Sequence, residues 1–107
     1  MTIFGKREES FERKFALDEE LRFKANARRN RLLGEWVASK LGKSGQDASD
    51  YARSVILADF EEAGDEDVFR KVRADLDAAG VSVSETELRE TMDRLLAAAV
   101  QEIQAGN

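Results

Sequence analysis

The chain contains no proline in its 107 residues, and this absence constrains its fold more than any other feature of the sequence. Proline is the residue that most strongly interrupts a helix, so long helices can run here without a break. Gly42, Gly64 and Gly80 divide the sequence after residue 17 into four stretches of helical length. In each stretch apolar residues recur every three or four positions, which is the period of one helix face. The sequence therefore predicts an all-helical protein.

The first two predicted helices have clear boundary signals. Acidic residues at 18–20 suit the positive end of the first helix, and Gly42 is expected to end it. The residues Gly42-Lys43-Ser44-Gly45 are typical of a turn. The second helix is expected to begin near Asp47 and to end at Gly64.

The third and fourth predicted helices also have boundary signals. Asp65 is expected to cap the third helix and Gly80 to end it, and Ser84 with Glu87 has the spacing of a capping box for the fourth. The residues predicted to face the core are Leu21, Ala25, Leu32, Leu33, Trp36, Tyr51, Ala52, Val55, Ile56, Phe60, Val68, Phe69, Val72, Leu76, Leu88, Met92, Leu95, Leu96, Ala99 and Ile103. The predicted fold is all-α: a four-helix bundle over residues 18–107, preceded by a flexible or partly helical N-terminal arm, residues 1–17.

The composition argues against an enzyme. The chain has no cysteine and no histidine, which removes thiol chemistry, the commonest general base and the commonest metal ligands. Gly42-Lys43-Ser44 resembles the end of a phosphate-binding loop, but Val37 stands where that motif needs glycine. The acidic residues 59–67 suggest calcium, but an EF-hand loop that starts at Asp59 would need ligands at positions 63 and 70, where Ala63 and Arg70 stand. We expect no catalytic residues, no required cofactor and no metal, and a cytoplasmic protein without a signal or membrane-spanning segment.

Charge is distributed unevenly, with a net +4 over residues 1–43 and −9 over residues 44–107. Five basic residues, called here the basic strip, occur with no acid between them: Arg22, Lys24, Arg28, Arg29 and Arg31. Lys24, Arg28 and Arg31 share one helix face. Two interpretations stay open: the strip pairs with the acidic half of its own chain, or it contacts an anion such as ATP, ADP or an acidic protein surface. Nucleic acid is not indicated, because no helix-turn-helix or aromatic stacking array accompanies the strip.

The N-terminal arm carries a seam of aromatic residues. Phe4, Phe11 and Phe15 account for three of the six phenylalanines, and on a helix they would project within roughly 40° of each other. The rest of the arm is mostly charged and cannot build a core alone. Either Phe11 and Phe15 lie on the bundle, or the arm is a helix that binds a groove on a partner.

Two blocks of sequence resemble a known family. One comprises Phe4, the arm run Phe11-Glu12-Arg13-Lys14-Phe15-Ala16-Leu17-Asp18 and then residues 23–36, of which Ala27-Arg28-Arg29-Asn30-Arg31-Leu32-Leu33-Gly34 is the most specific part. The other is the acidic run of residues 58–68 with Arg70-Lys71-Val72 after it. Together they are similar to the zeta subunit of alphaproteobacterial F-type ATP synthases. The resemblance covers essentially the whole chain.

The resemblance implies a function. Such proteins are four-helix bundles whose N-terminal arm inserts into the catalytic head at an interface of the alpha and beta subunits next to the gamma rotor, folds into a helix and blocks ATP hydrolysis while permitting synthesis. The arm residues to which it points are Phe4, Arg7, Phe11, Arg13, Lys14 and Phe15. It also implies an adenine nucleotide as a ligand, a monomer when free, and a location peripheral to the inner membrane through the synthase, with no insertion of its own. Two alternatives remain: a bundle that senses ATP or ADP, and a structural assembly partner of the complex.

Overall fold

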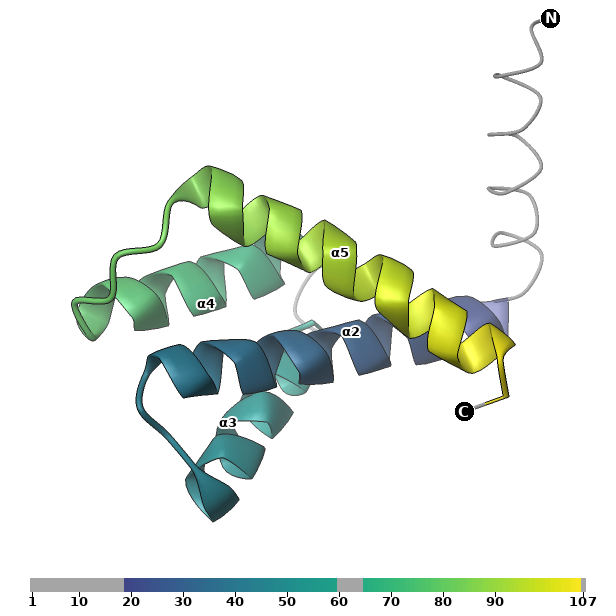
Figure 1. Ribbon diagram of the computed structural model, residues 1–107, viewed down its shortest axis with the longest axis horizontal. Helices are drawn as coiled ribbons and strands as arrows, with labels where there is room; N and C mark the ends of the chain where they lie inside the picture. The colour runs from purple at the N-terminus through teal and green to yellow at the C-terminus, as the bar shows by residue number, and fades with distance from the viewer. Residues whose placement is uncertain (1–18, 60–64, 107) are drawn as a thin grey trace, which may run out of the picture.

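The computed structural model describes residues 19–59 and 65–106, and within these ranges the protein consists of four α-helices. They are α2 (Glu19–Lys40), α3 (Gly45–Ala58), α4 (Glu66–Ala78) and α5 (Glu85–Gln104), as Figure 1 shows. The predicted all-α four-helix bundle is confirmed. The arm residues 1–17, the core residue Phe60 and the helix end at Gly64 lie outside the described residues.

The longest helix, α2, is the centre of the arrangement. It packs against both α3 and α5, and α4 contacts all three of the other helices. The turns that join α2 to α3 and α4 to α5 lie at one end of the molecule (Figure 1). At the other end, the C-terminal part of α5 lies beside the N-terminal part of α2. Residues near both ends of the described chain therefore come together.

The hydrophobic core lies between the helices and is built mainly from branched aliphatic side chains. Its buried members are Leu33, Val37, Val55, Val68, Phe69, Val72, Leu76, Val83, Leu88 and Met92. Several residues predicted for the core are only half-buried: Leu21, Leu32, Trp36, Tyr51, Ile56, Leu95, Leu96 and Ile103. Buried apolar residues that the prediction missed are Val37, Ala38, Ala58, Val83 and Val100.

The glycine signals at two helix ends are confirmed. Gly42 has φ of +79° and Gly80 has φ of +71°, a conformation that side chains with a Cβ rarely adopt. After α2, the amide of Lys43 donates a hydrogen bond to the carbonyl of Ala38 at 2.9 Å. After α4, the amide of Val81 donates a hydrogen bond to the carbonyl of Leu76, also at 2.9 Å. These are the six-to-one bonds of a Schellman motif, which satisfy carbonyls that a helix end leaves without partners.

Two predicted helix starts need correction. Helix α3 begins at Gly45, two positions before the expected Asp47, which instead occupies its first turn. Asp65 does stand at the N-cap of α4, but its side chain makes no capping hydrogen bond, because its carboxylate binds an arginine of α2. At α5 the prediction is confirmed, since the hydroxyl of Ser84 accepts a hydrogen bond from the amide of Glu87 at 3.0 Å.

The crossing of α2 and α3 is unusually close at Gly34. A methyl group added there would lie 2.5 Å from the Cα of Ala52 and 3.3 Å from its carbonyl oxygen. Only a residue without a side chain fits between the two helix backbones. This contact fixes the separation of the two helices and therefore the position of every residue that α3 presents beside α2.

None of the helices within residues 19–59 and 65–106 is long and apolar enough to cross a membrane. In the same ranges no cluster of carboxylates is arranged to hold a metal ion.

Candidate functional site

A groove with a volume of about 630 Å³ lies where α2, α3 and α5 meet. Its apolar lining comes from all three helices: Phe23 and Ala27 of α2, Ile56 of α3 and Ile103 of α5. The Phe23 side chain is 62% exposed, which is unusual for a residue of this size and polarity. The half-burial of Ile56 and Ile103, which were predicted for the core, is explained by their position in this groove.

Three residues of the basic strip line the same groove. Lys24, Arg28 and Arg31 stand along α2 at the spacing that the sequence analysis identified as one helix face, and the structure brings them together beside Phe23. Arg22 is exposed on α2 but is not among the residues that line the groove. The groove therefore combines an apolar lining with positive charge.

Two of the three groove cations pair with acids of their own helix, and the third pairs with an acid of another helix. Lys24 Nζ lies 2.9 Å from Glu20 Oε1, and Arg31 Nε lies 3.5 Å from Glu35 Oε2, both within α2. Arg28 Nη1 instead lies 3.3 Å from Glu102 Oε1 and so links α2 to α5. One of the two interpretations left open by the sequence was pairing with the acidic half of the chain. Within residues 19–59 and 65–106, the structure shows such a pair for Arg28, whereas the pairs of Lys24 and Arg31 lie within α2.

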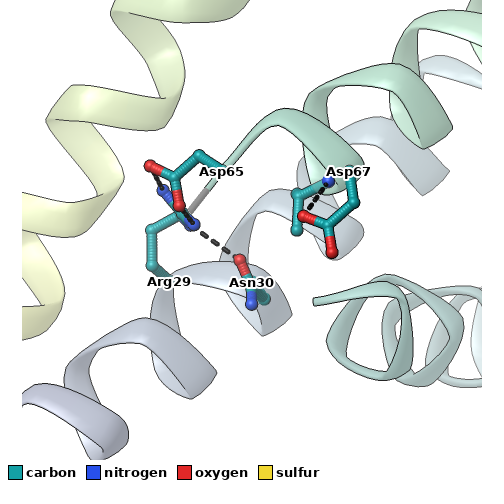
Figure 2. Close-up of polar contacts among 5 residues, drawn as sticks. Arg29, Asn30, Asp65 and Asp67 are labelled. Atoms are coloured by element: carbon teal, nitrogen blue, oxygen red, sulfur yellow. Dashed lines mark hydrogen bonds and ion pairs between the residues drawn. The ribbon is translucent and has the colours of Figure 1, made fainter. Parts of the chain in front are cut away.

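Arg29 is not on the exposed face that the sequence suggested. It is 1% exposed, and its guanidinium donates to both carboxylate oxygens of Asp65, at 2.8 Å and 3.3 Å. Its Nε donates to Asn30 Oδ1 at 2.7 Å, so the guanidinium lies between the two acceptors (Figure 2). The pKa of the Asp65 carboxyl is held below its usual range, chiefly by the hydrogen bond from Arg29. Arg29 thus fastens the start of α4 to α2 and is not available to an outside anion.

A smaller cavity of about 60 Å³ lies next to the groove and shares Phe23 and Ile56 with it. Asn30 is fully buried here, and its Nδ2 has no partner in good hydrogen-bond geometry among the described residues, although it lies close enough to Asp59 to favour the charged carboxylate. Asp59, at the end of α3, faces the same cavity. Burial raises the pKa of the Asp59 carboxyl, with added repulsion from Asp67, while Asn30 opposes this effect.

A second polar cluster joins α3 to α4. The hydroxyl of Tyr51 donates to Asp75 Oδ2 at 2.7 Å, and Lys71 Nζ donates to the same oxygen at 3.0 Å. Burial and this hydrogen bond raise the pKa of the Tyr51 hydroxyl. Because these polar groups satisfy one another, the cluster links α3 to α4.

The fold and the groove together define a small all-α bundle with a groove that is both basic and apolar. The chain belongs to the ATPase inhibitor subunit zeta family, whose model matches residues 1–102. The family that the sequence resembles is therefore confirmed, and the match includes the arm residues as well as the bundle.

The fold also has a close counterpart among solved structures. A protein whose structure was determined by solution NMR is 49% identical to this chain and superposes with a TM-score of 0.72. The comparison covers 81% of this chain and 99% of the other. No curated protein is significantly similar to the sequence.

Proposed function

We propose that this protein is a regulatory subunit that inhibits ATP hydrolysis by the catalytic head of an F-type ATP synthase. The observation that carries the proposal is the family match from residue 1 to residue 102, because it includes the arm and the bundle in one ATPase inhibitor family. The arm, residues 1–17, inserts at the interface of the alpha, beta and gamma subunits. The role requires no catalytic residue and no cofactor in this chain.

Physical chemistry supports the arm as the inserted element. Phe4, Phe11 and Phe15 form a seam on a segment that is otherwise mostly charged. Full burial of each phenylalanine is worth about 1.5–3 kcal/mol, which offsets the entropy lost when a few helical turns become ordered.

The basic residues of the arm provide its polar contacts. Arg7, Arg13 and Lys14 lie among the phenylalanines and can form charge-assisted hydrogen bonds with carboxylates or carbonyls of the head. Such bonds fix the register of a helix in its groove, while the phenylalanines supply most of the binding free energy. A block confined to hydrolysis follows if the accepting cleft closes only in the hydrolytic direction of rotation.

The proposal is tested by measuring ATP hydrolysis by the purified catalytic head. Full-length protein should lower the rate in proportion to its concentration, and protein that lacks residues 1–17 should not. Circular dichroism of the shortened protein is the control that its helices remain folded. Equal rates with full-length, shortened and no protein would refute inhibition. Binding of the full-length protein without any change in rate would favour a structural assembly partner.

A second candidate function is the binding of ATP or ADP. The observation that favours it is that Lys24, Arg28 and Arg31 line one groove together with the exposed Phe23, a combination that suits phosphates and a base. Nucleotide titrations followed by NMR should then shift resonances of these residues, and Arg28→Glu with Arg31→Glu should abolish the shifts. A titration without shifts would remove this candidate.

A further inference from the structure

The groove has the properties of a protein-binding surface as well as those of an anion site. Phe23 and Leu57, 62% and 58% exposed, are the two large hydrophobic side chains that the described residues leave exposed. Phe23 continues into the apolar lining of the groove, formed by Ala27, Ile56 and Ile103, whereas Leu57 is not part of that lining. An exposed aromatic side chain that is continuous with an apolar groove is typical of a docking site.

The cations are arranged as a row. Lys24, Arg28 and Arg31 are related as i, i+4 and i+7, so they extend along one face of α2 for about 10 Å. An antiparallel or parallel helix with acidic residues at the same spacing would meet each cation with a carboxylate. A single phosphate group would occupy only part of a row this long. The geometry therefore suits an acidic helix face better than a compact anion.

The present partners of two of these cations are easily replaced. Lys24 and Arg31 pair with carboxylates one turn away on α2, and in both pairs the side chains are more than half exposed. Exposed pairs of this kind contribute little to stability, so exchanging them for carboxylates of another chain has a small cost. Arg28 is different, since its contact with Glu102 helps to hold α5 against α2.

We propose that the groove of α2, α3 and α5 docks an amphipathic helix of the catalytic head, with apolar residues against Phe23 and acidic residues against Lys24, Arg28 and Arg31. This inference rests on the proposed function and adds a second contact to the one made by the arm. Glu19, the first residue of α2, stands two positions after the end of the arm at Leu17, so an arm inserted in the head holds the groove close to the surface of the head. Two linked contacts strengthen binding beyond either alone.

The test measures the dissociation constant of full-length protein and catalytic head at low and high salt. Phe23→Ser should raise the constant at least about tenfold, and Leu57→Ser, at a residue of similar exposure outside the groove, should leave it within about twofold. Lys24→Glu with Arg31→Glu should weaken binding at low salt and reduce its salt dependence. The matched control is Arg53→Glu with Arg94→Glu, which changes the net charge equally at exposed residues outside the groove.

Carbodiimide cross-linking of the wild-type complex identifies the partner chemistry, because this reagent joins lysine amines to carboxylates in direct contact. We expect Lys24 to be linked to an aspartate or glutamate in a helix of the head. Wild-type protein that fails to bind the head at all refutes the proposed function. If the wild type binds, but the groove variants bind equally well and Lys24 forms no link to the head, the docking proposal alone is wrong. Loss of ATP binding in the groove variants with unchanged binding to the head assigns the groove to a nucleotide and also overturns docking.

Discussion

Replacing Gly34 with alanine should destabilise the protein, although alanine is the better helix former. The added methyl would lie 2.5 Å from the Cα of Ala52, whereas ordinary carbon contacts are 3.5–4.0 Å. Helices α2 and α3 would have to separate by roughly 1 Å, because the contacted atom is backbone and cannot rotate away.

The expected magnitude follows from two opposing effects. Overpacking in a close contact costs about 1–3 kcal/mol, and a backbone clash lies at the upper end of that range. The higher helix propensity of alanine returns about 1 kcal/mol. We therefore expect a net loss of about 2 kcal/mol in the free energy of unfolding, which corresponds to a melting temperature lower by roughly 8 °C in a domain of this size.

The assay is thermal and urea unfolding followed by circular dichroism, with Ser39→Ala as the control at an exposed position of the same helix. The control should change stability by no more than about 0.5 kcal/mol. Combining Gly34→Ala with Ala52→Gly should not restore stability, since the closest contact is with the Cα of residue 52 and not with its side chain. Unchanged or increased stability in Gly34→Ala would refute the reasoning.

Three further predictions concern polar groups. Asp65→Asn should destabilise the protein at pH 7 by about 1–3 kcal/mol, less than for a fully buried pair because Asp65 is 47% exposed. Arg29 lowers the pKa of Asp65, so this contribution is fully present above the ordinary carboxyl pKa of about 3.9 and is lost as the pH falls through the lowered pKa. The free energies of unfolding of wild type and variant should therefore converge as the pH falls below that ordinary value. Asp59→Asn should raise the melting temperature at pH 7, because the raised pKa of Asp59 means that its charged carboxylate is disfavoured in the folded state. The gain should vanish below pH ~4, where the carboxyl is protonated in both the folded and the unfolded state. A gain that persists there would show that it does not come from the charge of Asp59. Ser84→Ala should cost about 1 kcal/mol through loss of the cap to the amide of Glu87, measured by urea unfolding, and no cost would show that water replaces the cap.

The fold could be predicted from the sequence because its signals are local. Gly42 and Gly80 end helices through a backbone conformation that glycine adopts without strain, and this preference acts whatever the rest of the chain does. Ser84 caps α5 for the same kind of reason, since the hydroxyl reaches an amide three residues away. Asp65 shows where such reasoning ends: its position at the N-cap was predicted, but its partner is 36 residues distant.

The burial of Arg29 could have been predicted from its helical spacing, but its charge favoured the opposite prediction. It stands four positions from both Ala25 and Leu33, which are buried, so the helical period places it on the core face of α2. Its charge grouped it with the exposed basic strip instead. A buried arginine requires an acidic partner, and only the tertiary structure identifies that partner as Asp65.

The groove could be predicted only in part. The shared face of Lys24, Arg28 and Arg31 follows from their spacing along one helix. The contribution of Ile56 and Ile103 depends on how α3 and α5 pack against α2, which spacing within one helix cannot reveal. The 62% exposure of Phe23 could not be predicted either, because an aromatic residue in an amphipathic helix is ordinarily expected on the buried face.

The central claim is that the arm phenylalanines drive inhibition, and the most direct measurement is the concentration of protein that halves ATP hydrolysis by the catalytic head. We compare the wild type with Phe11→Ala combined with Phe15→Ala, and with Leu57→Ala as the control at an exposed apolar residue of the bundle. Two phenylalanines worth about 1.5–3 kcal/mol each predict a half-inhibitory concentration at least on the order of a hundredfold higher for the double variant, with the control unchanged. Equal inhibition by wild type and double variant would contradict the account.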